Sequence, residues 1–268
     1  MHIRPFISLT SDFGVQSQGV GIMEAVAWEI CPMTKVVHLM HGLPDFDITM
    51  GARTMETVAY LPVGCHVCVV DPGVGTVRKG IIIKVKRGDY LIGPDNGVLI
   101  PATRFLDDIE KVVEVKNPTY MRQPVSPIFH GRDVFMPAAA HLACGVPIEK
   151  FGAEVAASSL VAAPYEEALL TNGTLHAQII SVNKYGSVHL NVMHAQWDEF
   201  KVSRGQHIFI EVRGDIIELL HVTTFAEVTK GNALIMKDDY GRVEAAINQG
   251  SFAERYGVAV GDEVTVRK

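Results

Sequence analysis

The sequence has no apolar stretch of the roughly 18 residues that a membrane-spanning helix needs. It also has no run of lysine or arginine, and its formal net charge is -6. A nucleic-acid-binding surface is therefore not expected, because such surfaces are basic. The opening residues, 1–6, lack the apolar core of a signal peptide. We expect a cytoplasmic protein that has neither a membrane nor a nucleic acid as its partner.

Cysteine is scarce, with four residues among 268. Cys65 and Cys68 have a CxxC spacing, but they lie in an apolar run that reads as a strand, where positions three apart face opposite sides. A zinc or redox site is therefore not expected there. We expect Cys31, Cys65, Cys68 and Cys144 to be buried free thiols in a reducing compartment.

The first part of the chain alternates strand and helix patterns. Strands are expected at 6–10, 35–39, 65–70, 80–86, 89–92 and 112–115, and helices at 18–30 and 49–60. A third helix would begin at Asp133 as its cap and continue to Cys144, with Gly145 as its end. This alternation predicts a doubly wound α/β domain over residues 1–162.

The pattern changes after about residue 160. Residues 162–167 read as a linker, and short alternating runs follow, separated by turn residues, at 175–182, 188–192, 207–212, 216–221, 232–236 and 263–266. One short helix is expected at about 251–256. The pattern predicts a smaller C-terminal β-barrel domain over residues 172–268.

The segments 70–78 and 129–133 together carry a carboxylate, a guanidinium and an imidazole. Asp71 follows a buried strand and precedes Pro72 and two glycines, so it lies where open α/β sheets place ligands; Asp-Pro-Gly is also common turn chemistry. Asp12 ends the first strand and is either a ribose ligand or a cap. His130 and Asp133 have the spacing of two metal ligands, but no third ligand accompanies them, and no metal is expected.

Several motifs occur in order: TSDFG at 10–14, VVDPGVGTVR at 69–78, GPDNGVL at 93–99, FHGRDVFMPAAA at 129–140 and NQGSFAERYGVAVGDEV at 248–264. Together they resemble the S-adenosyl-L-methionine hydroxide adenosyltransferase family, relatives of the fluorinases and chlorinases. The resemblance implies an N-terminal α/β domain, a C-terminal β-barrel and a homotrimer with substrate between neighbouring subunits. Family members split S-adenosyl-L-methionine with water into adenosine and L-methionine.

The resemblance also implies site residues. The family's Asp-Arg-His trio falls on Asp71, Arg78 and His130, and the halide-using relatives lack the motif centred on this aspartate. We expect Asp71 to orient Arg78, Arg78 to favour developing hydroxide, and a neutral His130 to take the proton of the water. Asp12 would hold the ribose. No metal or redox cofactor is required, since S-adenosyl-L-methionine is the substrate.

The chain departs from the family at the start of the barrel domain. The family's Asp-x-Phe-Gly-Asn reads here as Asn183, Lys184, Tyr185, Gly186 and Ser187. Asn183 stands where an aspartate would meet the methionine ammonium, and Ser187 stands where an asparagine would meet adenine. Tyr185 can still stack on a purine.

Either Asp239 or Glu244 could supply the carboxylate that Asn183 lacks for the methionine ammonium. Two other functional classes also stay open. One is a halide-using or altered-substrate adenosyltransferase, and the other is a non-catalytic module that binds adenosine or S-adenosyl-L-methionine.

Overall fold

The computed structural model describes residues 6–268, which divide into two compact units, one that ends at Pro164 and one over Tyr165–Lys268. Each unit has its own apolar core. Among the described residues, no helix is long and apolar enough to cross a membrane.

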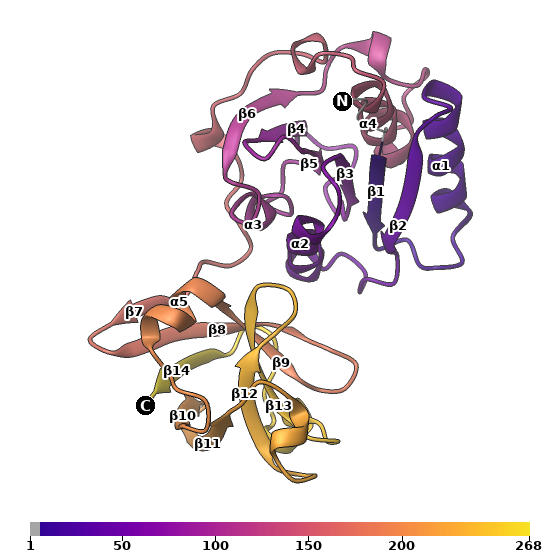
Figure 1. Cartoon of the computed structure of the whole chain (residues 1–268). Helices are drawn as coiled ribbons and strands as arrows, with labels where there is room; N and C mark the ends of the chain where they lie inside the picture. The colour runs from indigo at the N-terminus through magenta and orange to yellow at the C-terminus, as the bar shows by residue number, and fades with distance from the viewer. Residues whose placement is uncertain (1–5) are drawn as a thin grey trace. The chain divides into compact units, whose positions relative to one another are not determined.

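A six-stranded sheet forms the centre of the N-terminal unit (Figure 1). Its order is β2-β1-β3-β5-β4-β6. The strands β1, β2, β3 and β5 run parallel, and β4 runs antiparallel to β5 and β6. The strand bounds are Phe6–Ser11 (β1), Lys35–Met40 (β2), Cys65–Val69 (β3), Gly80–Val85 (β4), Tyr90–Pro94 (β5) and Ile109–Glu114 (β6).

Helices cover both faces of this sheet, as a doubly wound fold requires. The chain crosses outward from β1 to β2 and then returns past β1 to β3, and right-handed crossovers in opposite directions place their helices on opposite faces. Helix α1 packs with α4, and α2 packs with α3 (Figure 1). Their bounds are Gln18–Ile30 (α1), Ile48–Glu56 (α2), Ile100–Thr103 (α3) and Met136–Ala143 (α4). The predicted α/β fold is confirmed.

The expected helix cap at Asp133 is wrong. A π-helical turn, Gly131–Phe135, precedes α4, and Asp133 lies inside it, fully buried. Its carboxylate accepts the Ser126 N–H at 2.8 Å and two bonds from the guanidinium of Arg132. Asp133 therefore anchors the preceding loop, and the cap is unnecessary because the π turn runs directly into α4.

All four cysteines were expected to be free thiols, and two of them are not. Cys31 at the end of α1 and Cys144 at the end of α4 form a disulfide across a separation of 113 residues. Cys65 and Cys68 are buried free thiols, and burial raises the pKa of Cys68 to about 12. The pairing of α1 with α4 brings Cys31 and Cys144 together, and no spacing in the sequence signals it.

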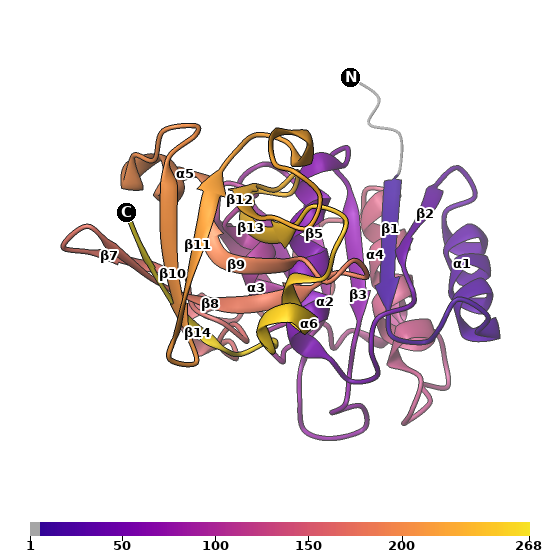
Figure 2. The same cartoon turned by 90° about the horizontal axis from the view of Figure 1, so that it is seen from below.

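The C-terminal unit is a closed barrel (Figure 2). Its sheet has the order β14-β10-β11-β12-β13-β9-β8-β7, and β14 also pairs with β8, which closes seven strands and leaves β7 outside the ring. The bounds are Leu169–Thr171 (β7), Thr174–Val182 (β8), Val188–Met193 (β9), His207–Val212 (β10), Asp215–His221 (β11), Ala233–Lys237 (β12), Arg242–Ile247 (β13) and Glu263–Arg267 (β14). The predicted barrel is confirmed.

The sequence did not predict the strands β7 and β13 or the helices α3 and α5 (His194–Phe200), whereas it did predict the short helix α6 (Phe252–Tyr256). Part of the expected linker also packs on the barrel, since Tyr165 is buried and the Glu166 carbonyl accepts the Asn191 side-chain amide at 2.7 Å. Short 3₁₀ turns occupy Thr57–Tyr60, Pro118–Tyr120, Ile148–Lys150, Ala157–Ser159 and Phe225–Glu227.

Candidate active site

A cavity of about 230 Å³ lies at the carboxyl ends of β1 and β3 in the N-terminal unit. These strands are neighbours, with Ser11 opposite Val69, so the residues that follow them meet at one edge of the sheet. Three predicted site residues line the cavity: Asp12, Asp71 and His130. The sequence separates these residues widely, and the sheet order brings them together.

Arg78 is held against Asp71 in a two-pronged ion pair. Its Nε donates to Asp71 Oδ1 at 2.9 Å, and its Nη2 donates to Asp71 Oδ2. The two side chains are only 11% and 5% exposed, so the pair is shielded from solvent. The loop between them needs Gly75, which has φ 76° and lies where a Cβ would come within 2.6 Å of the Pro127 carbonyl oxygen.

His130 completes the trio through the same arginine. Arg78 Nη2 lies 2.7 Å from His130 Nδ1. A guanidinium can only donate, so Nδ1 accepts this bond. Burial, together with the charge of Arg78, holds the pKa of His130 below its usual range, so the ring is neutral at pH 7. Its one proton therefore lies on Nε2, and His130 is a hydrogen-bond donor in this arrangement.

The sequence missed that restriction on His130, which had been expected to act as a base. Nothing in the local sequence signals it, because Arg78 and His130 are 52 residues apart. The Arg78 guanidinium also lies over the Phe135 ring, 5.1 Å from its centroid. The π turn that contains Phe135 thus supports both members of the pair, and π turns are frequent at functional sites.

Asp12 lies on another wall of the cavity. Its Oδ2 accepts the Phe46 N–H at 3.0 Å, which leaves further lone pairs on both oxygens for a ligand. Phe13, Phe46, Ile128 and Phe129 add apolar surface, and Asp45 adds a second carboxylate. The sequence did not predict these lining residues as part of the site. The one signal was Pro44, which marks the turn in which Phe46 adopts φ 64°.

Three predicted ligands in the barrel unit share one turn between β8 and β9. Asn183 Oδ1 accepts the N–H groups of Tyr185 and Ser187 at 2.9 and 3.1 Å. Tyr185 is 68% exposed, with the Lys184 ammonium over its ring, and Ser187 is buried. Asn183 therefore shapes the turn with its oxygen, and its amide nitrogen has no such bond to the turn.

The other two predicted ligands lie on or beside β13. Glu244 is buried on that strand opposite His189 of β9, and Asp239 is exposed in the turn before it. The adjacent Asp238 shapes this turn, because its carboxylate accepts the Tyr240 and Arg242 N–H groups and contacts His189.

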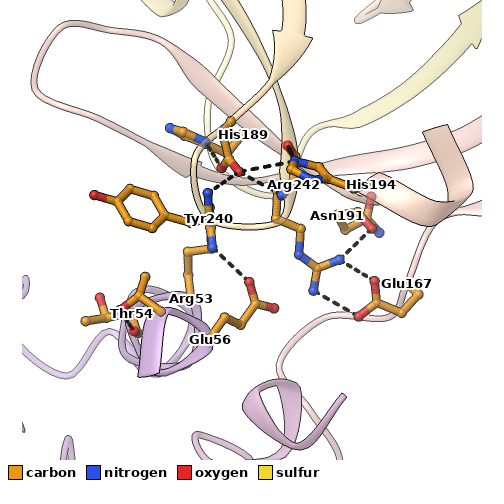
Figure 3. A network of polar contacts seen from close by, with 11 residues as sticks. Arg53, Thr54, Glu56, Glu167, His189, Asn191, His194, Tyr240 and Arg242 are labelled. Carbon is orange, nitrogen blue, oxygen red and sulfur yellow. Dashed lines mark hydrogen bonds and ion pairs between the residues drawn. The ribbon is translucent and has the colours of Figure 1, made fainter. Parts of the chain in front are cut away.

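Arg242 ties the same turn to the start of the barrel unit (Figure 3). Its side chain is fully buried, and its guanidinium binds the Glu167 carboxylate through both terminal nitrogens and the Asn191 carbonyl at 3.0 Å. The turn that carries Asp239 is thus held rigidly from both sides.

Across residues 6–268, no group of three or more histidine, cysteine, aspartate or glutamate side chains is arranged to hold a metal ion. Asp133, which has ligand spacing to His130, is committed to Arg132 and Ser126.

Models of two domains match this chain: the SAM hydroxide adenosyltransferase N-terminal domain over residues 7–152, and the C-terminal domain of the same family over residues 177–265. The chain belongs to the SAM hydroxide adenosyltransferase family. The resemblance seen in the sequence motifs is thereby confirmed.

Relatives in this family cover nearly the whole chain. An (R)-S-adenosyl-L-methionine hydrolase of Salinispora arenicola is 34% identical over 99% of both chains. A fluorinase of Nocardia brasiliensis is 25% identical over 98% of this chain and 97% of its own. A crystal structure of an uncharacterized conserved protein from Thermotoga maritima covers 98% of this chain and 100% of its own, with a TM-score of 0.90 and 27% identity.

Proposed function

We propose that this adenosyltransferase is a hydrolase that splits S-adenosyl-L-methionine with water into adenosine and L-methionine. The observation that carries the proposal is one cavity lined by Asp12, Asp71 and His130, with Arg78 bonded to both Asp71 and His130. The identity with relatives named (R)-S-adenosyl-L-methionine hydrolase supports it and is higher than the identity with fluorinases.

The reaction is an in-line displacement at the ribose 5′ carbon. The water oxygen forms the new bond to carbon, the carbon–sulfur bond breaks, and its electron pair returns to sulfur, so methionine leaves as a neutral thioether. The attacking oxygen becomes strongly acidic as its bond to carbon forms. Each Asp71 oxygen has a lone pair beyond the one that Arg78 occupies, and we assign the proton to this carboxylate on its way to solvent.

Arg78 and His130 stabilise the nucleophile in this scheme. The guanidinium charge and the His130 Nε2–H favour negative charge on the oxygen, as donors preorganised in a partly buried site do. The reaction as written requires neither a metal nor a redox cofactor, and turnover that persists in a chelator is the expected result.

Asp12 holds the ribose through its two hydroxyls. Charge-assisted hydrogen bonds of this kind contribute about 1.5–3 kcal/mol each. We expect 2′-deoxyadenosine to bind more weakly than adenosine, and equal affinity would contradict this role. Phe13, Phe46 and Phe129 supply apolar surface for the nucleoside.

We extend the proposal to the residues of the barrel unit, to the assembly and to the location. Asn183, Tyr185, Ser187 and either Asp239 or Glu244 would bind the rest of the substrate, in a homotrimer with substrate between neighbouring subunits. The exposed apolar side chains of Phe46 and Ile128, 69% and 79% exposed at the cavity, support a covering partner. Light scattering tests the trimer. Cell fractionation tests a cytoplasmic location, against which the Cys31–Cys144 disulfide weighs.

The deciding experiment uses oxygen-18 water. Purified protein is incubated with each sulfonium epimer of S-adenosyl-L-methionine, with and without chloride or fluoride. The products are separated and their masses are measured by mass spectrometry. We expect solvent oxygen in adenosine and none in methionine. A 5′-halo product would favour a halide-using enzyme, and binding without turnover would favour a non-catalytic module.

A further inference from the structure

A chain of hydrogen bonds runs from the end of β1 to the surface of the N-terminal unit. Ser11 Oγ lies 2.7 Å from His41 Nδ1, His41 Nε2 lies 2.9 Å from His38 Nδ1, and His38 Nε2 lies 3.0 Å from Glu24 Oε2. Ser11 and His41 are buried, whereas the side chains of His38 and Glu24 are 36% and 28% exposed. The outer end opens into a groove between α1 and β2 that Glu24, His38 and His41 line.

Glu24 gives this chain one direction. Its carboxylate can only accept, so His38 Nε2 donates, and the Nδ1 of a neutral His38 must accept from His41 Nε2. His41 Nδ1 then accepts the Ser11 hydroxyl proton. Burial and the neighbouring His38 lower the pKa of His41 to about 4, which keeps its ring neutral as this arrangement requires.

The inner end of this hydrogen-bond chain holds the loop of Asp12, Phe13 and Gly14, here called the Asp12 loop. Ser11 Oγ, whose O–H donates to His41, accepts the Phe13 N–H at 3.4 Å, and the His41 carbonyl accepts the Gly14 N–H at 2.7 Å. Asp12 and Phe13 line the cavity, whereas Ser11, His38 and Glu24 do not. Ser11 and His41 therefore contact the loop directly, and His38 and Glu24 reach it only through His41. None of the four lines the space in which a ligand would bind.

We propose that Ser11, His41, His38 and Glu24 are positioning residues that hold the Asp12 loop in its nucleoside-binding conformation. This inference rests on the proposed function, because that function assigns Asp12 to the ribose. The Asp71–Arg78–His130 trio makes no contact with the chain among the hydrogen bonds described above. Disturbing the chain should therefore weaken nucleoside binding and raise KM more than it lowers kcat.

The test reverses the direction of the hydrogen bonds by a substitution at the exposed end of the hydrogen-bond chain. In Glu24→Lys the residue at the outer end can only donate, so both histidines should move their proton from Nε2 to Nδ1. His41 Nδ1–H would then donate to Ser11 Oγ and compete with the Phe13 N–H for the lone pairs of that oxygen. The matched control is Glu29→Lys, because Glu29 is exposed on the same helix and the change in charge is identical. Nitrogen-15 spectra of the histidine rings report the tautomers, and calorimetry reports adenosine affinity.

We expect Nε2–H tautomers for both rings in the wild type and in Glu29→Lys, and Nδ1–H tautomers in Glu24→Lys. Adenosine should bind Glu24→Lys about fivefold more weakly, the equivalent of one neutral hydrogen bond, with kcat changed less than KM. A tautomer switch with unchanged adenosine affinity would overturn the positioning role, and unchanged tautomers would overturn the chain itself. Both readouts work without turnover, so a protein that binds adenosine but does not cleave S-adenosyl-L-methionine would refute only the proposed function.

Discussion

The proton on His130 decides what this residue contributes. With Nδ1 occupied by Arg78, the neutral ring presents Nε2–H and has no free lone pair for the proton of a water molecule. A donor of this kind should be replaceable by another donor, whereas a base should not.

His130→Gln should therefore keep much of the activity that His130→Ala loses. A glutamine amide can donate from about the position of Nε2. We expect kcat to fall about 10²-fold or more in the alanine variant, the scale of one lost transition-state donor, and clearly less in the glutamine variant, with KM little changed in both. Single-turnover kinetics would measure this, and equal losses in the two variants would restore the general-base role.

A second prediction at this scale concerns Asn183. Its Oδ1 accepts two backbone N–H groups, and an aspartate oxygen would accept the same bonds, so Asn183→Asp should leave the turn intact. The added charge should strengthen binding of the methionine ammonium by about 1 kcal/mol. We expect KM for S-adenosyl-L-methionine to fall several-fold and adenosine affinity to stay the same.

The competing arrangement is an anionic contact relocated to Asp239. If Asp239→Ser raises KM strongly while Asn183→Asp changes nothing, the ammonium is bound at the β12–β13 turn. The double variant separates the two arrangements, because only independent contacts give additive changes.

At the scale of elements, the ends of the first and third strands were predictable, and their contacts were not. An apolar run followed by Asp12 or by Asp71 marks the ligand edge of a parallel sheet. The bond between Arg78 and His130 depends on how the loop after β3 meets the π turn, which no local pattern encodes. The missed strand β13 is buried along its whole length, and its apolar run Ala245–Ile247 breaks the alternation that marks a strand. Alanine is also depleted in strands.

The cysteines show the same limit. Cys31 and Cys144 end two helices that pack side by side, and a separation of 113 residues hides this from the sequence. Both helices begin near the cavity, since α1 follows the Asp12 loop and α4 follows His130. The disulfide thus joins the far ends of the two helices that carry these loops.

Breaking this disulfide should destabilise the N-terminal unit. Chain entropy for a loop of about 100 residues gives a stabilisation of about 4–5 kcal/mol, an upper figure if the reduced chain retains structure. We expect Cys144→Ser, and the wild type in reductant, to unfold at a lower denaturant concentration than the oxidised wild type. Reductant should have no further effect on Cys144→Ser, which serves as the control. An unfolding midpoint that does not respond to reductant would contradict the prediction.

For the whole molecule, acid should destabilise the fold through its histidines. Burial, the first cause in each case, lowers the pKa of His41 to about 4 and lowers those of His66, His130 and His141. Below about pH 6.5, the usual histidine pKa, the unfolded chain binds protons that the folded chain does not. Stability is therefore full above that pH and declines below it, down to about pH 4 for His41.

Urea denaturation between pH 7.5 and 4.5 measures this decline. Each histidine that stays neutral in the fold contributes about 1.4 kcal/mol per pH unit below the usual histidine pKa. Of the four histidines with a lowered pKa, His41 and His66 are buried. His41→Asn should flatten the dependence, and His176→Asn, at an exposed position, should not. A midpoint constant over this range would contradict the prediction, because it would mean that the histidines bind protons in the fold as readily as in the unfolded chain.

The double pairing of β14 has a consequence for biosynthesis. The sheet of the N-terminal unit has all its strands once residue 114 has been made, and its apolar core is complete with Phe151, so this unit can fold while the barrel is still being translated. The barrel cannot, because β10 and β8 both wait for the strand that ends at Arg267. Until then two strand edges stay open to other nascent chains. A ribosome stalled before codon 263 would therefore carry a folded N-terminal unit joined to an open barrel whose unpaired strand edges are prone to aggregation.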